Sequence, residues 1–532
     1  MRLPLPLERP TLPALLRARA EQLGDEAALV HDDEALSWAG LDARSRELAR
    51  RLVAAGVGKR SRVGVLLPNG IEWAVVACAI LRVGGVLVPL STLLRPPELE
   101  AQLRGASVSQ LILARTHRGR DYRSELHALD PGLAELGAAR RRHPRLPSLR
   151  AVWSADALPT ATAPESLVRG LEDAVRPADD LAILFTSGSR GAPKGCIHTH
   201  AGALRAVASG LEARCIGRGD RLYIPMPFFW TGGFSGGLLT ALVAGATLLT
   251  ESDPTTPAGT LAFLERERAT LFRGWPDQAA KVAADPAFAS TDLSSLGPAS
   301  LGALLPEAQR PQPGARANLF GMTETFGPWC GSRLDTDLPE EKWGSCGKPF
   351  PGVEVRIVDP EKGEPLEPGE PGEIALRGPH LMRGIVGRLR EAVFTRDGFY
   401  RTGDLGILDR DGYLFYRGRA DDMFKVSGAT VYPSEVEAAL RAIPGVAQAF
   451  VTNLAEADGE TVGAAVVTRA SLEPADLDRE ARARLSAFKV PRRWARLSSL
   501  QEVPTLATGK VDKAGLQRLI RDVGEVAPPR RS

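Results

Sequence analysis

The chain has 532 residues, 44% of them hydrophobic, which is enough for more than one domain with its own core. Its 67 basic and 64 acidic residues leave a formal charge of +3, so neither a nucleic-acid partner nor an acidic disordered tail is indicated. The N-terminal segment Met1–Pro13 interrupts its apolar residues with proline and charge, which is not the pattern of a signal peptide.

Apolar strand-like runs alternate with amphipathic helical segments through the first half of the chain, a pattern that predicts parallel α/β sheets. The predicted helices are Ser37–Ala55, Gly70–Arg82, Pro96–Gly105, Ala203–Leu211 and Gly236–Ala244. The predicted strands are Arg62–Leu67, Gly85–Pro89, Gln110–Ala114, Leu181–Phe185, Asp220–Ile224 and Thr247–Leu249. The longest apolar run, Trp73–Leu81, is far shorter than the roughly 20 residues of a membrane span.

The pattern changes after about residue 350. Short alternating runs at Val353–Val358, Gly372–Arg377 and Gly412–Arg417 predict antiparallel strands of a distorted β-barrel. A compact α+β tail follows, with helices Pro433–Ile443, Pro474–Ala487 and Lys513–Val523 and strands Val446–Asn453 and Thr461–Arg469. We expect a large N-terminal domain, residues 1–420, and a small C-terminal domain, residues 421–532.

The five cysteines are scattered and include no CxxC pair, so neither a zinc site nor a disulfide framework is indicated. Reduced thiols are typical of the cytoplasm, which is where we expect the protein.

A loop rich in small and hydroxyl residues follows the predicted strand Leu181–Phe185. Small residues let backbone N–H groups turn inward around an anion, hydroxyls add donors, and a lysine adds positive charge. The pattern therefore predicts a triphosphate site, although it is not a Walker A loop, because no GxxxxGK[ST] occurs. A flexible surface turn is the other interpretation. The candidate residues are Thr186, Ser187, Gly188, Ser189, Arg190, Gly191 and Lys194.

This loop resembles the TSGSTGxPKG segment of the adenylate-forming superfamily, which includes acyl-CoA synthetases and other AMP-dependent synthetases and ligases. Segments similar to four more motifs of that superfamily follow in order. The resemblance implies a large N-terminal domain that binds ATP, Mg²⁺ and a carboxylic acid, and a small mobile C-terminal domain that carries a catalytic lysine.

Asn318–Glu324 resembles the superfamily's YGMTE segment. The resemblance implies that Phe320 stacks on adenine beside Gly321 and Met322, that Thr323 contacts phosphate and that Glu324 holds Mg²⁺. The chemistry is reasonable by itself, because a flat apolar ring suits a purine face and a divalent cation can join a carboxylate to a triphosphate.

Tyr400–Leu405 resembles the YRTGD motif, in which Asp404 would bind both ribose hydroxyls. Tyr416–Glu437 is similar to the family's linker, so Arg419 would contact the nucleotide and Asp421 would be the hinge of domain rotation. The residues expected to line the thiol tunnel are Lys425, Ser427 and Gly428. Glycine there lets backbone pass close to a thin pantetheine arm. Ser434 is the expected N-cap of the following helix, with Glu437 three residues on.

Pro504–Lys513 resembles the C-terminal PxTxxGK motif, which makes Lys510 the lysine that bridges carboxylate and α-phosphate. Attack of an anionic carboxylate on an anionic triphosphate needs a positive charge between them. The catalytic candidates are Lys510, Thr186 and Glu324.

The chain departs from the superfamily's pattern at several positions. Arg190 replaces the usual threonine of the loop and could clamp phosphate or point to solvent. Trp230 stands where histidine is common, in a segment that lines the acyl pocket of the family. The acyl-pocket candidates are Phe228, Phe229, Trp230, Gly233 and Phe234. An aromatic wall favours a hydrophobic or aromatic acid, with the alternative that two of these aromatics pack the core.

We therefore expect an ATP-dependent ligase that forms an acyl-adenylate and then a thioester with CoA, without a covalent enzyme nucleophile. One alternative keeps the adenylation step but passes the acyl group to a carrier-protein pantetheine or another nucleophile. A second is a non-catalytic nucleotide-binding or scaffold protein. The expected partners are a small carboxylic acid, ATP and a thiol, with no nucleic acid and no membrane span, and a homodimer is left open.

Overall fold

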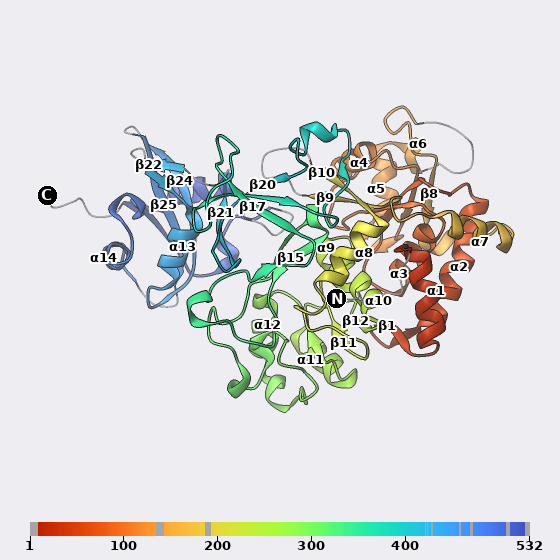
Figure 1. Ribbon diagram of the computed structural model, residues 1–532, viewed down its shortest axis with the longest axis horizontal. Coiled ribbons are helices and arrows are strands. Elements are labelled where there is room, and N and C mark those ends of the chain that lie inside the picture. The colour runs from red at the N-terminus through yellow and green to blue at the C-terminus, as the bar shows by residue number, and fades with distance from the viewer. Residues whose placement is uncertain are drawn as a thin grey trace. The chain divides into compact units, whose positions relative to one another are not determined.

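The computed structural model describes residues 9–134, 143–186, 193–420, 422, 424–426, 429–456, 459–468, 472–506 and 511–526 (Figure 1). The chain divides into two compact units. Unit 1 comprises Met1–Glu354 and Arg377–Phe399, and unit 2 comprises Val355–Leu376 and Tyr400–Ser532. The expected division at residues 420 and 421 concerns which part rotates, and it stays a prediction.

Unit 1 contains a seven-stranded sheet of strand order β19-β10-β9-β4-β3-β5-β8. The strands are β3 (Arg62–Leu66), β4 (Val86–Pro89), β5 (Gln110–Leu113), β8 (Ala151–Ser154), β9 (Asp180–Thr186), β10 (Lys194–Thr199) and β19 (Gly384–Ile385). Five of them are parallel, but β10 runs antiparallel to both β9 and β19. The sheet is therefore mixed, because the short connection between β9 and β10 cannot make the long crossover that parallel strands need.

Helices cover this sheet, as the alternating pattern predicts. They include α2 (Trp38–Ala54), α3 (Ile71–Arg82), α4 (Pro96–Gly105), α7 (Glu165–Ala174) and α8 (His200–Ser209). Helix α2 begins where Ser37 accepts a hydrogen bond from the backbone N–H of Gly40. Almost every residue of α3 is buried, so this helix lies inside the core.

A second sheet of unit 1 has the strand order β13-β11-β12-β1-β2. Its strands are β1 (Ala27–His31), β2 (Glu34–Ser37), β11 (Arg221–Tyr223), β12 (Thr247–Thr250) and β13 (Leu271–Phe272). The helices around it include α1 (Leu12–Leu23), α9 (Thr231–Gly233), the π-helix η2 (Phe234–Leu239), α10 (Thr240–Ala244), α11 (Pro257–Arg266) and α12 (Pro276–Ala283). The helix predicted over Gly236–Ala244 thus begins earlier and is partly a π-helix, a form that is often found at functional sites.

The region predicted as a distorted barrel consists, in the described residues, of two small antiparallel sheets. One lies in unit 1 and joins β14 (Phe320–Met322), β15 (Gly327–Gly331) and β16 (Lys348–Pro349). The other joins β17 (Glu354–Val358), β18 (Gly372–Arg377), β20 (Tyr400–Leu408) and β21 (Leu414–Arg419). Strand β20 carries Asp404, so the second sheet positions the predicted ribose ligand.

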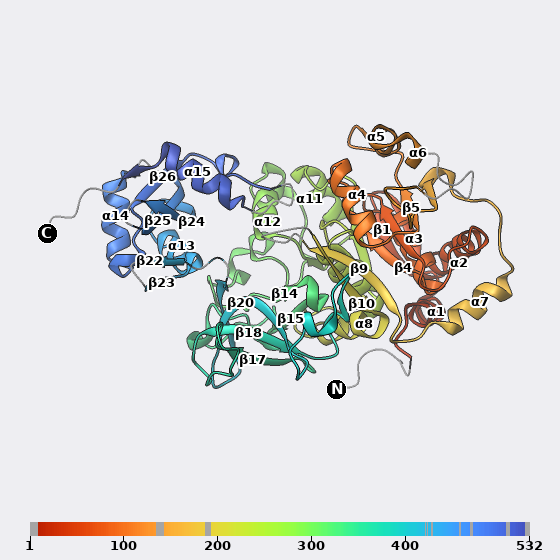
Figure 2. The ribbon, with the colours of Figure 1, turned by 90° about the horizontal axis from the view of Figure 1, so that it is seen from above.

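The rest of unit 2 is an α+β fold, as predicted (Figure 2). Its four-stranded sheet joins β24 (Val446–Glu456), β25 (Gly459–Thr468), β26 (Arg493–Leu497) and β27 (Glu525–Val526). The helices α13 (Pro433–Arg441), α14 (Pro474–Arg482) and α15 (Lys513–Val523) and the hairpin of β22 (Phe424–Val426) and β23 (Ala429–Val431) complete it.

The expected capping role of Ser434 is wrong. The N-cap of α13 is Tyr432, because Pro433 takes the first helical position, where its fixed φ suits a helix start. The Ser434 hydroxyl instead donates to the carbonyl of Arg417 in β21. Glu437 accepts from the backbone N–H of Val451 in β24 and so fixes α13 on the sheet.

All five cysteines are reduced, and four of them are buried, namely Cys78, Cys196, Cys330 and Cys346. Cys215 is half-buried. None of the described helices combines the length and the apolar character that a membrane crossing requires.

Candidate nucleotide and acyl site

The two ends of the predicted phosphate loop are held together by strand pairing. Thr186 ends β9, Lys194 begins β10, and the two residues face each other across the ladder. The loop therefore begins at the carboxyl end of a strand in a largely parallel sheet. This is the edge of the sheet at which α/β proteins bind ligands. The loop residues Ser187, Gly188, Ser189, Arg190 and Gly191 lie outside the described residues.

The charges of Glu324 and Lys194 both act on the thiol of Cys196 in β10. Burial raises the pKa of the Cys196 thiol, the negative charge of Glu324 raises it further, and the positive charge of Lys194 lowers it. Strand β9 also packs against the short helix η6 (Thr323–Thr325), which carries Glu324. Unit 1 thus brings the two ends of the phosphate loop, Thr186 and Lys194, near the segment that carries Glu324.

The turn that carries Glu324 is held by the hydroxyl of Thr325, a residue that the motif analysis did not single out. The Thr325 hydroxyl donates to the carbonyl of Gly327 at 2.7 Å and accepts from the backbone N–H of Met322 at 3.2 Å. A Cβ at Gly321 would lie 2.4 Å from the carbonyl oxygen of Gly327, so only glycine fits there. The backbone N–H of Met382 donates to the carbonyl of Glu324 at 2.7 Å.

Phe320, the predicted adenine platform, is supported by a buried indole. Its ring centroid lies 5.6 Å from that of Trp329, with the planes at 72°. Trp329 is only 1% exposed, so the edge-to-face contact fixes the orientation of the half-buried Phe320 ring. Stacking of adenine on this ring stays a prediction.

The aromatic segment between β11 and α9 is held by Asn69, a residue that the sequence motifs did not identify. The Asn69 amide donates to the carbonyl of Met226 at 3.0 Å and accepts from the backbone N–H of Phe228 at 2.7 Å. A Cβ at Gly233 would lie 2.1 Å from the carbonyl oxygen of Pro227, so glycine is required for this tight turn.

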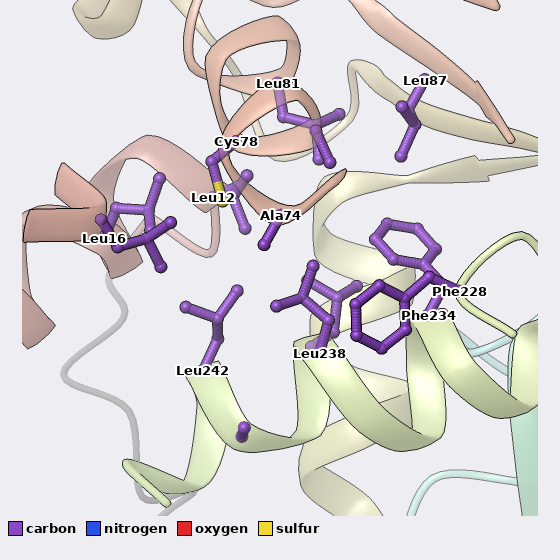
Figure 3. Close-up of a cluster of buried hydrophobic side chains, with 14 of the residues drawn as sticks. Leu12, Leu16, Ala74, Cys78, Leu81, Leu87, Phe228, Phe234, Leu238 and Leu242 are labelled. Atoms are coloured by element: carbon purple, nitrogen blue, oxygen red, sulfur yellow. The ribbon is translucent and has the colours of Figure 1, made fainter. Parts of the chain in front are cut away.

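The aromatic candidates of this segment divide into two groups. Phe228 and Phe234 are fully buried and lie against Trp73 of α3, with ring centroids 5.3 and 5.5 Å away. Figure 3 shows both rings in the apolar cluster beside Leu238. These two fit the alternative that part of the aromatic segment packs the core.

The second group leaves aromatic surface accessible. Phe229 and Trp230 meet edge to face at 5.4 Å, and Trp230 meets Trp275 in the same way at 6.2 Å. Trp275 is 41% exposed and precedes α12, far from the predicted acyl motif in sequence. The hydroxyl of Thr231 also reaches the hydroxyl of Thr323 at 3.4 Å, which places this aromatic segment beside the turn of Glu324.

Unit 2 brings together Asp404, the predicted ribose ligand, and Arg419, the predicted nucleotide contact. Asp404 and Arg419 face each other on β20 and β21, with Nη1 of Arg419 3.1 Å from Oδ1 of Asp404. Asp404 is buried, and its backbone N–H donates to the hydroxyl of Thr402 at 3.0 Å. Gly403 between them adopts φ +73°, a left-handed conformation that glycine tolerates best.

The remaining predicted residues of unit 2 lie largely outside the described residues. Asp421, Ser427, Gly428 and Lys510 are all outside them, and of Lys425 only the backbone is described, paired with Thr430 in the β22–β23 hairpin. Two neighbours of these residues are described. Asp422, which follows Asp421, forms an ion pair with Lys513 at the start of α15. This pair connects the residue after the predicted hinge to the helix that follows the predicted catalytic loop.

Two family models match the chain. Residues 16–386 match the family model described as AMP-binding enzyme, and residues 435–510 match the AMP-binding enzyme C-terminal domain. The chain is 32% identical to a feruloyl-CoA synthase of Amycolatopsis sp over 94% of its own length and 97% of the relative's. It is 30% identical to a 3-hydroxybenzoate--CoA ligase of Aromatoleum sp. (strain CIB), over 94% and 95% of the two chains.

A solved structure resembles the whole chain. The O-succinylbenzoate coenzyme A synthetase MenE of Bacillus subtilis, in complex with ATP and magnesium ion, superposes with a TM-score of 0.76. It is 25% identical in sequence, and the match covers 96% of this chain and 99% of that one. Because one family model spans most of the first unit and its companion model falls within the second, the chain belongs to the AMP-binding enzyme family, as the motif resemblance implied.

Proposed function

We propose that this protein is an AMP-forming acyl-CoA ligase whose acid is hydrophobic or aromatic. The carboxylate attacks the α-phosphorus of ATP, and pyrophosphate leaves. The CoA thiol then forms a bond to the acyl carbon as the bond to AMP breaks and the thiol proton passes to water. The observation that carries the proposal is the convergence of Lys194, Glu324 and an aromatic segment in unit 1. Positioning and charge neutralisation supply most of the catalysis of such a transfer.

The side chains of unit 1 fit a magnesium ion that arrives with the nucleotide. Mg²⁺ binds one or two carboxylates together with substrate phosphates. Glu324 provides a carboxylate close to Lys194, and the hydroxyls of Thr186 and Thr323 lie on the adjoining strand and helix. Within the described part of the chain, no group of three or more His, Cys, Asp or Glu side chains could hold a metal without such a ligand. Mg²⁺ would neutralise phosphate charge, and Lys510 would bridge carboxylate and α-phosphate.

The acid class follows from aromatic side chains that lead from the buried Phe229 to the exposed Trp275. Phe229, Trp230 and Trp275 form a continuous aromatic run that is open to a ligand at Trp275. Aromatic surface favours an apolar or aromatic acid over acetate or a polar amino acid. The names of two relatives, a feruloyl-CoA synthase and a 3-hydroxybenzoate--CoA ligase, also contain aromatic acids.

A mass-spectrometric assay tests the activity. The full-length protein is incubated with MgATP, CoA and one acid at a time from aryl, medium-chain and amino-acid panels, and AMP and acyl-CoA are measured. We expect both products with an aryl or medium-chain acid. AMP without any acyl-CoA, followed by acylation of an added carrier protein, would assign the alternative acceptor. No AMP and no pyrophosphate exchange with any acid would contradict the ligase itself.

Two tryptophan variants test whether the acid binds at the aromatic run. Trp275→Ala should raise KM for the best aryl acid about three- to tenfold, because an aromatic pair contributes roughly 0.5–1.5 kcal/mol. KM for ATP should stay within about twofold, since the ring that Trp275 contacts is Trp230 of the aromatic segment. The matched control is Trp343→Ala, a half-buried tryptophan whose indole donates to the carbonyl of Leu338. Equal changes in both variants would contradict the placement of the acid.

We further propose a cytoplasmic location, which is typical of a protein whose cysteines are all reduced. Light scattering of the purified protein tests whether it forms a homodimer. Fractionation of expressing cells tests the location, and recovery of the protein outside the cytoplasm would contradict it.

A further inference from the structure

The π-helix η2 is connected to the turn of Glu324 by a buried serine. Ser235 is 2% exposed, and its hydroxyl donates to the backbone carbonyl of Phe326. Its own carbonyl accepts from the hydroxyl of Thr240 at 2.7 Å, so both ends of the residue are fixed. Thr231, four residues earlier, reaches Thr323 from the same helical segment. We call the aromatic segment together with η2 the acyl segment. Two hydroxyl contacts thus join it to the turn that carries Glu324.

Phe326 is a point at which the backbone conformation needs support. It adopts φ +58° and ψ 25°, and this left-handed conformation costs a bulky residue roughly 1–2 kcal/mol. Its ring is fully buried and lies 4.8 Å from that of His198 and 5.8 Å from that of Phe234. Phe234 is the residue next to Ser235, so the π-helix holds Phe326 through both its ring and its carbonyl.

The conformation of Phe326 is transmitted directly to Glu324. The backbone N–H of Phe326 donates to the carbonyl of Thr323 at 3.0 Å and closes the turn over Glu324. Thr325, inside that turn, bonds to Gly327 on the far side of Phe326. A shift of the Phe326 peptide must therefore move the carboxylate-bearing residue, because both neighbours in the turn are tied to it.

We propose that Ser235 is a positioning residue that sets the Glu324 carboxylate for Mg²⁺ and couples its position to the acyl segment. The inference rests on the proposed function. The acid-binding aromatic segment and the turn that carries the metal-binding carboxylate are connected by hydrogen bonds, and Ser235 makes one of them. Loss of its hydroxyl leaves the acid site in place and displaces the carboxylate.

The main experiment measures the magnesium dependence of AMP formation. Ser235→Ala should lower kcat for adenylation about 10- to 100-fold and raise the Mg²⁺ concentration for half-maximal rate about tenfold, with KM for the acid within about threefold. The control is Ser295→Ala, in which a half-buried hydroxyl that donates to the carbonyl of Ala269 at 2.8 Å is lost outside the site. This variant should match the wild type. An unchanged magnesium dependence in Ser235→Ala overturns the proposal.

A double-mutant cycle with Glu324→Gln tests the route of the effect. If Ser235 acts through Glu324, the combined variant is no slower than Glu324→Gln alone. Losses that multiply would show an independent structural role and overturn the proposal. Should Ser235→Ala fail to fold, the pair Thr325→Ser and Thr325→Val decides. Only the valine variant, which lacks the hydroxyl, should need more Mg²⁺, and equal magnesium dependence in the two overturns the proposal.

Failure of the proposed function would look different, because the wild type itself would then form neither AMP nor acyl-CoA with any acid. An active wild type with a Ser235→Ala variant indistinguishable from Ser295→Ala refutes the positioning role alone.

Discussion

At the scale of single residues, Gly403 shows how a turn can decide whether two functional side chains meet. A Cβ at Gly403 would lie 2.9 Å from Nη2 of Arg419, which pairs with Asp404. Gly403→Ala should therefore displace the guanidinium and raise KM for ATP about tenfold, because hydrogen bonds to charged groups contribute roughly 1.5–3 kcal/mol. Steady-state kinetics with ATP as the varied substrate measure the effect.

Gly412 offers the matched control. It has φ +81°, and a Cβ there meets nothing within 4 Å. Gly412→Ala should carry the same backbone cost, about 1 kcal/mol of stability, and leave KM for ATP unchanged. If both variants raise KM equally, the contact with Arg419 is not the cause.

A buried histidine predicts a dependence of stability on pH. Burial lowers the pKa of His198 to about 3, well below the value of about 6.5 of an unfolded chain. Between these values the unfolded state binds the proton and the folded state does not. The free energy of unfolding should therefore fall as pH falls below about 6.5, by up to roughly 1.4 kcal/mol per pH unit.

The variant His198→Leu should lose this part of the slope, measured as urea midpoints of unfolding between pH 5 and pH 7. The control is His127→Leu, which removes an exposed histidine of the helix Tyr122–Leu129 and should keep the wild-type slope. Equal slopes in the two variants would show that His198 is not a source of the acid sensitivity. His200, whose pKa burial lowers to about 4, contributes in the same direction and accounts for part of what remains.

At the scale of elements, three helices of unit 1 meet at a buried ion cluster. Arg82 of α3 is 0% exposed and bonds to Glu172 of α7 at 2.6 Å and to Asp42 of α2 at 2.7 Å. Arg82→Met would remove the buried cation and leave Asp42 and Glu172 with Arg46, 2.9 and 3.9 Å away. We expect a loss of about 3 kcal/mol, the low end of the cost of breaking a buried pair. Chemical denaturation of the purified protein measures the loss.

A surface ion pair that also involves helix α7 provides the comparison. Arg17 pairs with Asp173, the neighbour of Glu172, and both side chains are well exposed. Arg17→Ala should cost less than about 1 kcal/mol, because solvent screens the pair. A similar loss in both variants would mean that burial of the cluster does not determine its contribution.

Sequence patterns predicted best those elements whose formation is local. The helices Pro96–Gly105 and Lys513–Val523 have their predicted bounds, because a proline start in one and strong amphipathic periodicity in the other define them. Strand β26 was not predicted, because its residues Arg493–Leu497 lack a regular alternation of polar and apolar side chains and depend on pairing with β25. The antiparallel direction of β10 likewise depends on its neighbours rather than on its own composition.

The same distinction holds for the candidate site. Motif residues such as Lys194 and Glu324 could be named from the sequence, because their segments resemble motifs of the superfamily and their charges suit a phosphate–magnesium site. Asn69 and Trp275 could not, because each is a single residue without a local pattern. The contacts of Asn69 reach Met226, 157 positions away, and only folding brings the two together.

At the scale of the whole molecule, a single substitution should impair one half-reaction and spare the other. Lys510→Ala should slow adenylation about 100- to 1,000-fold, because it removes a charge from between two anions, and should leave thioester formation from supplied acyl-adenylate within about threefold. Asp421→Pro should do the reverse, since proline fixes φ at the expected hinge. Single-turnover assays of each half-reaction measure this. Equal loss of both steps in each variant would contradict domain rotation.

The burial of the cysteines has a practical consequence for measuring the reaction. Burial raises the pKa of Cys78 to about 12 and that of Cys330 further still, and a protonated thiol is a poor nucleophile. Of the five cysteines only Cys215 is partly accessible. A colorimetric thiol reagent should therefore titrate a single protein group in the native state and all five after denaturation. The CoA that remains in samples withdrawn from the reaction can then be determined against a small, constant background.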